Sequence, residues 1–364
     1  WPPPKPAPPL EAPLLEAPPL GAPNTGLRSS MKLSLDTPEQ LSELAYAQGW
    51  LPRSVSVTRL TIAGPGNMNC VLRGHLSSDD SLIFKQSLPW VAKYPDIPAP
   101  VERLDVEAAF FSALRDQTAL VARMPRILGY AEEERILCMQ DLGAGQDFTG
   151  LYATSTADLV RWVDALSGLA EWLAALHRVA VDDPEAFTNR SMRRLNHEHI
   201  FVLPLTQDIG PTPAIGQAVS ELRQDATLRA AAERLGKIYL GNLETSAACL
   251  LHGDFYPGSW LQTSKSAMVI DPEFGFFGPP EFDVGVMLAH LQFAGFDASA
   301  RASILSGYRP IEAYQPALAD AFAAIEVIRR LLGVARLPLE ASPETLGHWL
   351  IRARDTLVAW HNAC

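Results

Sequence analysis

The sequence has few cysteines, and none of them are paired at a metal-binding spacing. The four cysteines stand at positions 70, 138, 249 and 364, no two of them form a C-x-x-C motif, and no histidine cluster lies beside them. Zinc sites and disulfide frameworks need closely spaced or paired cysteines. We therefore expect free thiols in a reducing compartment, which indicates a cytoplasmic protein without structural zinc.

Long apolar runs and an excess of basic residues are also missing. No uninterrupted apolar run reaches the ~18 residues that a membrane span requires, and the chain does not start with the basic-then-apolar order of a secretory signal. The 41 acidic residues outnumber the 30 basic ones and give a formal net charge of −11. A general nucleic-acid or anionic-membrane binder would present a basic face, so we expect neither nucleic acid nor membrane as a partner.

Proline, by contrast, is abundant at the start of the chain. Residues 1–30 hold 10 of the 30 prolines and begin W-P-P-P-K-P-A-P-P. Proline fixes φ and donates no backbone hydrogen bond, so this stretch is expected to form an extended or disordered tail. A passive tail or a wrongly assigned start explains it more simply than a ligand for proline-binding domains, because ordinary sequence begins at Met31.

The sequence pattern of the remaining chain changes near residue 140, from mostly strand-like to mostly helical. Three alternating apolar and polar stretches, at 54–63, 70–76 and 81–88, are separated by turn residues and predict antiparallel strands in series. T-P-E-Q at 37–40 predicts the start of a helix, with Thr37 as N-cap and Pro38 in the first turn. Further elements are predicted as a helix at 104–114, strands at 125–130 and 135–139, and helical segments at 157–179, 213–247, 281–295, 314–335 and 343–361.

This order predicts an α+β fold with two lobes. Residues 31–140 would form an N-lobe, a small antiparallel β-sheet with one main helix that binds nucleotide phosphates. Residues 141–364 would form a larger, mostly helical C-lobe, after a hinge at 140–146 where glycine and aspartate gather. Ligand sites favour the space between two such lobes.

Two acidic motifs flank a short predicted hairpin in the second lobe. The first reads H-G-D-F-Y-P-G-S-W at 252–260 and the second I-D-P-E-F at 270–274. Asp271 lies 17 positions after Asp254, and two short strands joined by T-S-K-S at 263–266 fit this interval. The hairpin would bring the two motifs side by side. H-G-D alone is more often a turn, whereas its pairing with the second motif favours a catalytic role for its aspartate.

These residues suit phosphoryl transfer from ATP. Such transfer needs a carboxylate that orients the acceptor hydroxyl and hard oxygen ligands that hold Mg²⁺. We predict Asp254 as the catalytic carboxylate and Asp271 and Glu273 as metal ligands, with a backbone bend at Pro272. Ser259 stands where protein kinases place a metal-binding asparagine, and a hydroxyl there would act through water or not at all.

Two neighbouring residues are expected to support this loop without direct chemistry. His252 is more simply a loop anchor than a base. Asp283, in the stretch E-F-D-V-G, is expected to accept hydrogen bonds from the amides of the H-G-D loop.

The first lobe offers groups for the nucleotide. Lys85 in I-F-K-Q-S-L alternates with apolar neighbours, so we expect it to face inward and hold ATP phosphates, with Glu107 on the next helix as its charge partner. A surface lysine is the plainer alternative. The predicted cofactor-binding residues are Gly64, Gly66 and Asn67 in the turn G-P-G-N-M-N, Lys85 with Glu107, and backbone groups of Gln140 and Leu142 beside the adenine.

The motifs resemble those of the methylthioribose kinases, members of the aminoglycoside/choline kinase-type phosphotransferases. The likeness covers roughly residues 40–340 and is carried by H-G-D-F-Y-P-G-S, V-I-D-P-E-F-G-F-F-G-P-P-E-F-D-V-G, G-P-G-N-M-N-C-V, F-K-Q-S-L-P-W-V and E-V-I-R-R-L-L-G-V-A. The resemblance implies a bilobal protein-kinase-like fold, ATP and Mg²⁺, and the 1-hydroxyl of 5-methylthioribose as acceptor in methionine salvage. It also implies that Arg329 and Arg330 approach the sugar and the transferred phosphate, and that a homodimer forms.

The sequence departs from this family near the expected acceptor position. Tyr256 stands where the family usually has histidine, the stretch K-Y-P-D-I-P-A-P lacks the family's tryptophan, and A-L-H-R-V at 175–179 is closer to the wider phosphotransferases. Tyr256 is therefore a candidate substrate contact. Two alternatives stay open: a phosphotransferase acting on another sugar, an aminoglycoside or an amino alcohol, and a nucleotide-binding scaffold without turnover.

Overall fold

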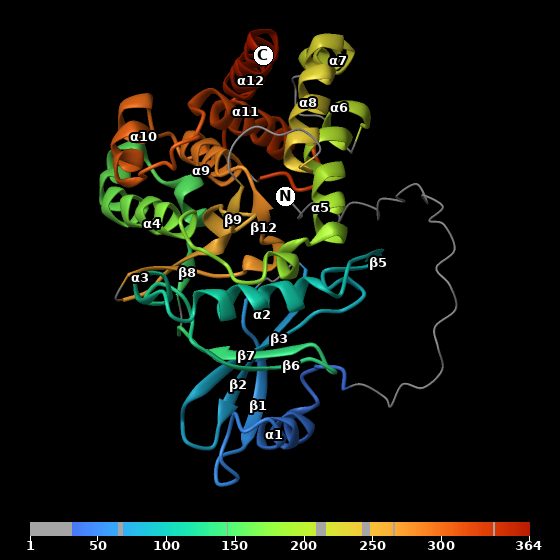
Figure 1. Cartoon of the computed structure of the whole chain (residues 1–364), viewed down its shortest axis with the longest axis vertical. Helices are drawn as coiled ribbons and strands as arrows, with labels where there is room; N and C mark the ends of the chain where they lie inside the picture. Colours follow the sequence, from blue (N-terminus) through green and yellow to red (C-terminus); the bar gives the residue numbers. More distant parts are fainter. Residues whose placement is uncertain are drawn as a thin grey trace, which may run out of the picture. The chain divides into compact units, whose positions relative to one another are not determined.

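The computed structural model describes residues 31–64, 68–143, 145–208, 216–241, 248–264, 266–337 and 339–364 (Figure 1). Chain contacts divide the protein into Trp1–Met31 and one compact unit, Lys32–Cys364. The predicted proline-rich tail, together with Gly66 and Asn67, lies outside the described residues.

A five-stranded antiparallel sheet forms the first part of the compact unit, in the order β1-β2-β3-β7-β6. Its strands are β1 (Val57–Ile62), β2 (Cys70–Leu76), β3 (Ser81–Gln86), β6 (Ile127–Ala131) and β7 (Ile136–Gln140). The three strands predicted in series and the two predicted later are confirmed, and they join into one sheet.

The alternation of side chains in β3 aims Lys85 at one face of this sheet. Phe84 is fully buried and its ring lies 6.5 Å from that of Trp50, which follows helix α1 (Pro38–Ala47). Neighbouring residues of a strand point to opposite faces. Lys85 therefore points away from Trp50, toward helix α2 (Arg103–Leu114).

Helix α1 begins where the sequence predicts, but its cap differs. Pro38 takes the first turn, as expected. The Thr37 hydroxyl makes no bond to the helix amides and instead donates to the Ser34 carbonyl at 2.8 Å. The capping interaction predicted for Thr37 is thus wrong, because the hydroxyl closes a turn with the residues before the helix.

A small hairpin that the sequence did not predict connects β3 to α2. It consists of β4 (Trp90–Val91) and β5 (Tyr94–Pro98). The pairing is short and irregular, with a register shift between Trp90 and Val91. Helix α3 (Thr118–Val121) follows α2.

The remaining chain is mostly helical, as predicted, and Figure 1 shows these helices across α2 from the sheet. The helices are α4 (Val163–Leu176), α5 (Arg190–His197), α6 (Leu203–Thr206), α7 (Gly216–Gln224), α8 (Ala226–Tyr239), α9 (Glu281–Phe293), α10 (Ala298–Ile304), α11 (Pro316–Leu332) and α12 (Pro343–Ala363). Shorter turns are η1 (Phe148–Ala153), η2 (Thr156–Trp162), η3 (Pro184–Phe187), η4 (Glu198–Val202) and η7 (Leu305–Gly307).

Several helix boundaries differ from the predictions. The segment expected at 157–179 becomes an α-helix only from Val163, after the turn η2. The segment expected at 213–247 contains two helices, because Asp225 caps α8 by accepting hydrogen bonds from the amides of Thr227 and Leu228. Helices α5 and α10 are short and were not predicted.

Three pairs of short strands carry the acidic motifs. Strand β10 (Trp260–Gln262) pairs with β11 (Ala267–Val269), which confirms the hairpin predicted around 263–266. The neighbouring pairs are β8 (Gln146–Asp147) with β10 and β9 (Cys249–Leu251) with β12 (Phe276–Gly278). Turns η5 (Pro257–Ser259) and η6 (Pro272–Phe274) complete this region.

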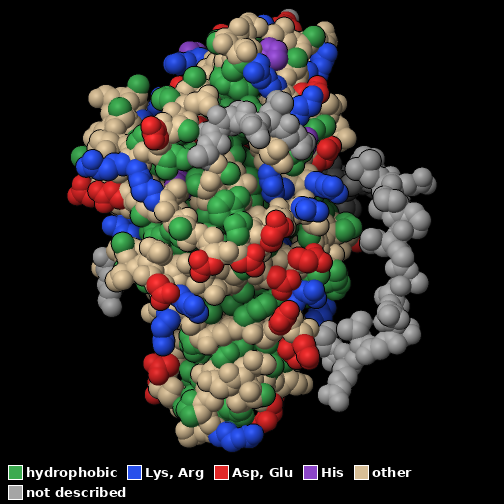
Figure 2. Space-filling model, viewed as in Figure 1, with side chains coloured by type: hydrophobic (Ala, Val, Ile, Leu, Met, Phe, Trp, Pro, Cys, Tyr) green, Lys and Arg blue, Asp and Glu red, His purple; other side chains and the backbone are tan. Residues whose placement is uncertain are grey.

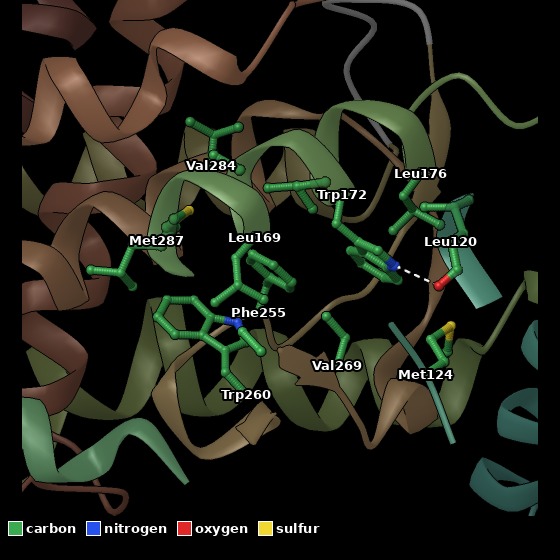
Figure 3. Packing of buried hydrophobic residues seen from close by; sticks show 14 of the residues in the cluster. Leu120, Met124, Leu169, Trp172, Leu176, Phe255, Trp260, Val269, Val284 and Met287 are labelled. Carbon is green, nitrogen blue, oxygen red and sulfur yellow. Dashed lines mark hydrogen bonds between the residues drawn. The ribbon is translucent and has the colours of Figure 1, made fainter. Parts of the chain in front are cut away.

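Aromatic packing fixes the loop that contains the H-G-D motif (Figure 3). The Phe255 and Trp172 rings stack with centroids 5.8 Å apart and planes 3° apart, and Trp260 lies 5.2 Å from Phe255. Trp172 is held in turn, because its Nε1 donates to the Leu120 carbonyl at 3.1 Å. Burial of rings this large contributes several kcal/mol of packing, so the loop is part of the core.

Charged side chains of both signs lie over the face of the molecule in Figure 2. Within the described part of the chain, no helix is both long and apolar enough to span a bilayer.

Candidate active site

Asp283 organises the backbone of the H-G-D loop. Its carboxylate accepts hydrogen bonds from the amides of His252 at 2.7 Å and Gly253 at 3.0 Å, as predicted. Gly253 has φ +83°, and a Cβ there would lie 2.1 Å from the Phe274 carbonyl oxygen. Only glycine fits this position. A side chain at position 253 would clash with Phe274, and the backbone could not take the conformation that places Asp254 in the site.

His252 anchors the same loop, which also confirms a prediction. Its Nε2 lies 3.0 Å from the Ile270 carbonyl, and the Asp254 amide donates to its Nδ1 at 3.4 Å. Both contacts need a neutral ring with the proton on Nε2. Burial agrees with this, because it lowers the pKa of His252 below its ordinary value. Since Ile270 precedes Asp271, this histidine links the two acidic motifs.

The Asp254 side chain faces two arginines without being fully paired. Its Oδ1 lies 3.5 Å from Arg330 Nη2 and 3.9 Å from Arg329 Nη1. This oxygen is buried, and it has no hydrogen-bond partner among the described residues. Burial raises the pKa of Asp254 above its ordinary value, although the two guanidinium groups act against this.

Glu326 holds the two arginines on helix α11. Its Oε1 accepts from Arg330 Nε at 2.6 Å and its Oε2 accepts from Arg329 Nη1 at 3.1 Å. Residues three and four positions apart share a helix face, so one carboxylate reaches both arginines. The Tyr256 ring supports the second one, because the Arg330 guanidinium lies 4.6 Å from the ring centre.

A further pair of residues, which the sequence did not reveal, supports Glu326. His290 Nε2 lies 3.2 Å from Glu326 Oε1, and the Tyr152 hydroxyl lies 2.6 Å from His290 Nδ1. Burial lowers the pKa of His290 to about 4, so the ring is neutral near pH 7. A neutral ring donates from Nε2 to the carboxylate and accepts from Tyr152 at Nδ1.

Lys85 is paired with two carboxylates at the junction of β3 and α2. Its Nζ lies 2.6 Å from Glu107 Oε2, the predicted partner, and 2.8 Å from Asp271 Oδ1. Lys85 and Glu107 are almost completely buried. Burial alone would lower the pKa of Lys85, but Asp271 and Glu107 outweigh it and raise the pKa above its ordinary value.

The predicted backbone bend between the acidic residues is present. Asp271 has φ +61° and ψ +51°, and the turn η6 starts directly after it. Asn189 fixes this turn, because its Nδ2 donates to the Glu273 carbonyl at 3.1 Å and to the Gly275 carbonyl at 3.0 Å. We call residues 271–275 the acidic turn.

The two carboxylates of the acidic turn have different surroundings. The Asp271 side chain is 48% exposed, whereas that of Glu273 is 7% exposed. Glu273 Oε2 accepts from Asn69 Nδ2 at 2.6 Å and lies 3.5 Å from Arg103 Nε. These two partners were not predicted. A cation in the first turn of α2 opposes the helix dipole, and this was the available signal that Arg103 has a tertiary role.

The remaining predicted residues are only partly placed. Ser259 Oγ donates to the Asp254 carbonyl at 2.9 Å. The Gln140 amide donates to the Arg126 carbonyl at 2.8 Å, so this amide is already used. Gly64 is the last residue of the described stretch 31–64, and Leu142 is the last but one of the stretch 68–143.

The structure thus brings the predicted residues into two clusters. Lys85, Glu107, Asp271 and Glu273 form the first, which we call the lysine cluster. Asp254, Tyr256, Arg329 and Arg330 form the second, which we call the Asp254 cluster. His252 Nε2, which lies at the Ile270 carbonyl, and the Ser259 carbonyl, which accepts from the Ile270 amide at 3.0 Å, connect the two motifs from which these clusters are built.

Comparison with known proteins identifies relatives of the chain. Residues 77–319 match the phosphotransferase enzyme family (APH). The methylthioribose kinase of Exiguobacterium sibiricum is 28% identical over 247 residues, which cover 64% of this chain and 60% of that protein. That of Erwinia tasmaniensis is 30% identical over 267 residues, which cover 68% and 63%. The chain spans about 60% of the length of these curated relatives.

Solved structures share the fold. A crystal structure of LicA in complex with AMP aligns with a TM-score of 0.52 at 13% identity and covers 90% of this chain and 100% of that one. Spectinomycin phosphotransferase APH(9)-Ia with ADP and spectinomycin aligns with 0.51 at 12% identity and covers 88% and 98%. The predicted bilobal protein-kinase-like α+β fold is confirmed. Since the family match extends over more than half of its residues, the chain belongs to the phosphotransferase enzyme family.

Proposed function

We propose that this protein is an ATP-dependent small-molecule kinase that transfers the γ-phosphoryl group to a sugar hydroxyl, with the 1-hydroxyl of 5-methylthioribose as acceptor. One observation carries the proposal: Asp254 Oδ1 is buried without a hydrogen-bond partner among the described residues, beside two buried arginines. A buried acceptor left unpaired is unfavourable unless a ligand supplies the donor.

The Asp254 cluster would bind the acceptor and the transferred group. Asp254 Oδ1 would accept the hydrogen bond of the acceptor hydroxyl and orient its oxygen toward the phosphorus. Arg330 Nη2 and Arg329 Nε are also buried without partners in the described part of the chain. These donors would bind the phosphoryl oxygens as charge develops on them. Tyr256 would hold Arg330 in place through its ring.

The lysine cluster and the end of β7 would bind the nucleotide. Lys85, fixed by Glu107, would hold the ATP phosphates. Gly64, Gly66 and Asn67 would lie over the phosphates through their backbone. Because the Gln140 amide is used within the sheet, its carbonyl and the Leu142 amide are the groups proposed for the adenine edge.

The acidic turn fits a magnesium ion by the chemistry of its donors. Mg²⁺ prefers oxygen ligands and is usually held by one or two carboxylates together with phosphates and water. Asp271 and Glu273 supply two carboxylates. The described residues contain no group of three or more His, Cys, Asp or Glu side chains that could together hold a metal ion, and a Mg²⁺ ion that binds phosphates does not require one. Asp271 and Glu273 would hold the ion, with Ser259 acting through water, and the ion would neutralise phosphate charge.

The charge of the Asp254 cluster favours an uncharged sugar over a cationic acceptor. Two arginines face Asp254 with Glu326 behind them, so an amine near the reacting hydroxyl would meet two positive groups. The curated relatives are methylthioribose kinases. Aminoglycosides and amino alcohols are therefore expected to react more slowly than 5-methylthioribose.

A coupled assay of ADP release tests the proposal. We expect release with Mg-ATP and 5-methylthioribose and much slower release with ribose, kanamycin or choline. Release that none of these acceptors stimulates would contradict the kinase function, and a preference for kanamycin or choline would contradict the acceptor alone.

A further inference from the structure

Arg103 is a fully buried arginine whose donors reach three separate segments of the chain. Its Nη1 donates to the carbonyls of Leu88, at 3.0 Å, and Pro100. Its Nη2 donates to the Met68 carbonyl at 2.9 Å, and its Nε donates to Asn69 Oδ1 at 2.8 Å. A guanidinium buried this deeply needs both hydrogen bonds and a counter-charge.

Glu273 supplies the counter-charge through a closed set of three side chains. Asn69 accepts from Arg103 with its Oδ1 and donates to Glu273 Oε2 at 2.6 Å with its Nδ2. Glu273 Oε2 lies 3.5 Å from Arg103 Nε. All three side chains are buried. Asn69 and Glu273 are 204 positions apart in the chain, so this contact joins distant elements.

The same acidic turn is bound to the sheet at a second point. Asp271 contacts Lys85 on β3, and Lys85 lies opposite Val71 on β2, two residues beyond Asn69. Asp271 thus attaches the acidic turn to β3, and Glu273 attaches it to Asn69, just before β2. Asn189 holds the backbone of the turn from the helical side. A change at Asn69 would release one of the two attachments to the sheet.

We propose that Asn69, Arg103 and Glu273 form a clasp that positions the lead-in of β2 and the start of α2 against the acidic turn, before any metal binds. Glu273 then has a positioning role in addition to its proposed contact with Mg²⁺. The inference rests on the proposed function, because the property that the clasp serves is nucleotide binding.

The test measures ADP affinity by calorimetry in EDTA and again with Mg²⁺. We expect Asn69→Ala to weaken metal-free ADP binding about tenfold, as expected when a buried carboxylate loses a hydrogen-bond donor. Glu273→Ala should weaken it similarly, and the double variant should be no weaker than the worse single variant. The Mg²⁺ concentration that half-saturates the ADP complex should stay within about twofold of wild type in Asn69→Ala. Asn362→Ala, at an exposed position, is the matched control.

Urea unfolding of wild type, the two single variants and the double variant gives a second reading, which needs no nucleotide. The clasp predicts that the losses in stability at Asn69 and Glu273 are not additive. Should Glu273→Ala fail to fold, Glu273→Gln replaces it in both measurements.

The outcomes separate the clasp from the proposed function. ADP binding by wild type that Asn69→Ala leaves unchanged would overturn the clasp and leave the kinase function intact. Additive losses in the double variant would also overturn it. A wild-type protein that binds no ADP would overturn the proposed function, and the role of the clasp with it.

Discussion

The lysine cluster and the Asp254 cluster hold their charges in different ways. Lys85 Nζ lies within 2.8 Å of two carboxylates, so its charge is balanced by the protein itself. Asp254 Oδ1 is no closer than 3.5 Å to a guanidinium and has no hydrogen-bond partner in the described part of the chain. The comparison teaches that the proposed nucleotide side is assembled by the fold, whereas the acceptor side keeps unpaired groups for its ligand.

Replacing the unpaired carboxylate should have the largest effect on activity. We expect Asp254→Asn to lower turnover about 10³-fold, within the range for a lost general base. ADP affinity should stay within about twofold of wild type, because this substitution leaves Lys85 and its partners in place. Coupled kinetics and calorimetry measure the two quantities. Turnover within tenfold of wild type would show that Asp254 is not the catalytic carboxylate.

Removing the lysine from the lysine cluster should instead lower the free energy of unfolding. Lys85→Met leaves Glu107 buried without its partner and should reduce the free energy of unfolding by about 3 kcal/mol. Adding Glu107→Gln removes the stranded charge and should restore most of this loss. Urea unfolding at pH 7 measures both variants. A double variant less stable than Lys85→Met would show that the pair is not the source of the loss.

The support beneath the arginines should appear as pH-dependent stability. The pKa of His290 is about 4 in the folded protein and about 6.5 when unfolded. The unfolded chain therefore binds more protons between these values, and folding weakens as pH falls from about 6.5 toward 4. We expect wild type to lose about 2 kcal/mol more than His290→Gln between pH 7 and 5.

The difference in pH-dependent stability between wild type and His290→Gln isolates the contribution of His290, because the other histidines are present in both proteins. Tyr152 on η1 and Glu326 and Arg330 on α11 face the ring and are unchanged in the variant. Equal losses in the two proteins would mean that His290 is protonated in the fold.

The smallest expected effect is at Tyr256. Tyr256→Leu removes the ring under Arg330 and should raise the KM for the acceptor about fivefold, as expected for a partly exposed cation–π contact. Tyr256→Phe keeps the ring and serves as the matched control. A Phe variant as impaired as the Leu variant would assign the role to the hydroxyl.

Local patterns made much of the lysine cluster predictable. Strand alternation placed Lys85 inward, and the next helix supplied Glu107. The interval between the acidic motifs predicted the hairpin β10–β11, and the position of Asp283 behind them predicted its bonds to the loop amides. In each case a short stretch and its spacing contain the information.

Contacts between distant side chains were not predictable. Asn69 and Glu273 meet across 204 positions, and no periodicity relates them. Tyr152 and His290 were missed for the same reason, since each looks like an ordinary aromatic position within its own segment. The arginine pair was predicted only through resemblance, because two adjacent arginines on a helix are usually solvated.

The most direct test of the contrast between the two clusters is the stability of Asp254→Asn. Burial raises the pKa of Asp254, so the ionised carboxylate destabilises the free protein at pH 7. We predict that Asp254→Asn unfolds at the same or a higher urea concentration than wild type, although it has lost turnover. A loss of stability as large as that of Lys85→Met would contradict the account, because it would show that Asp254 is already paired with the arginines in the free protein.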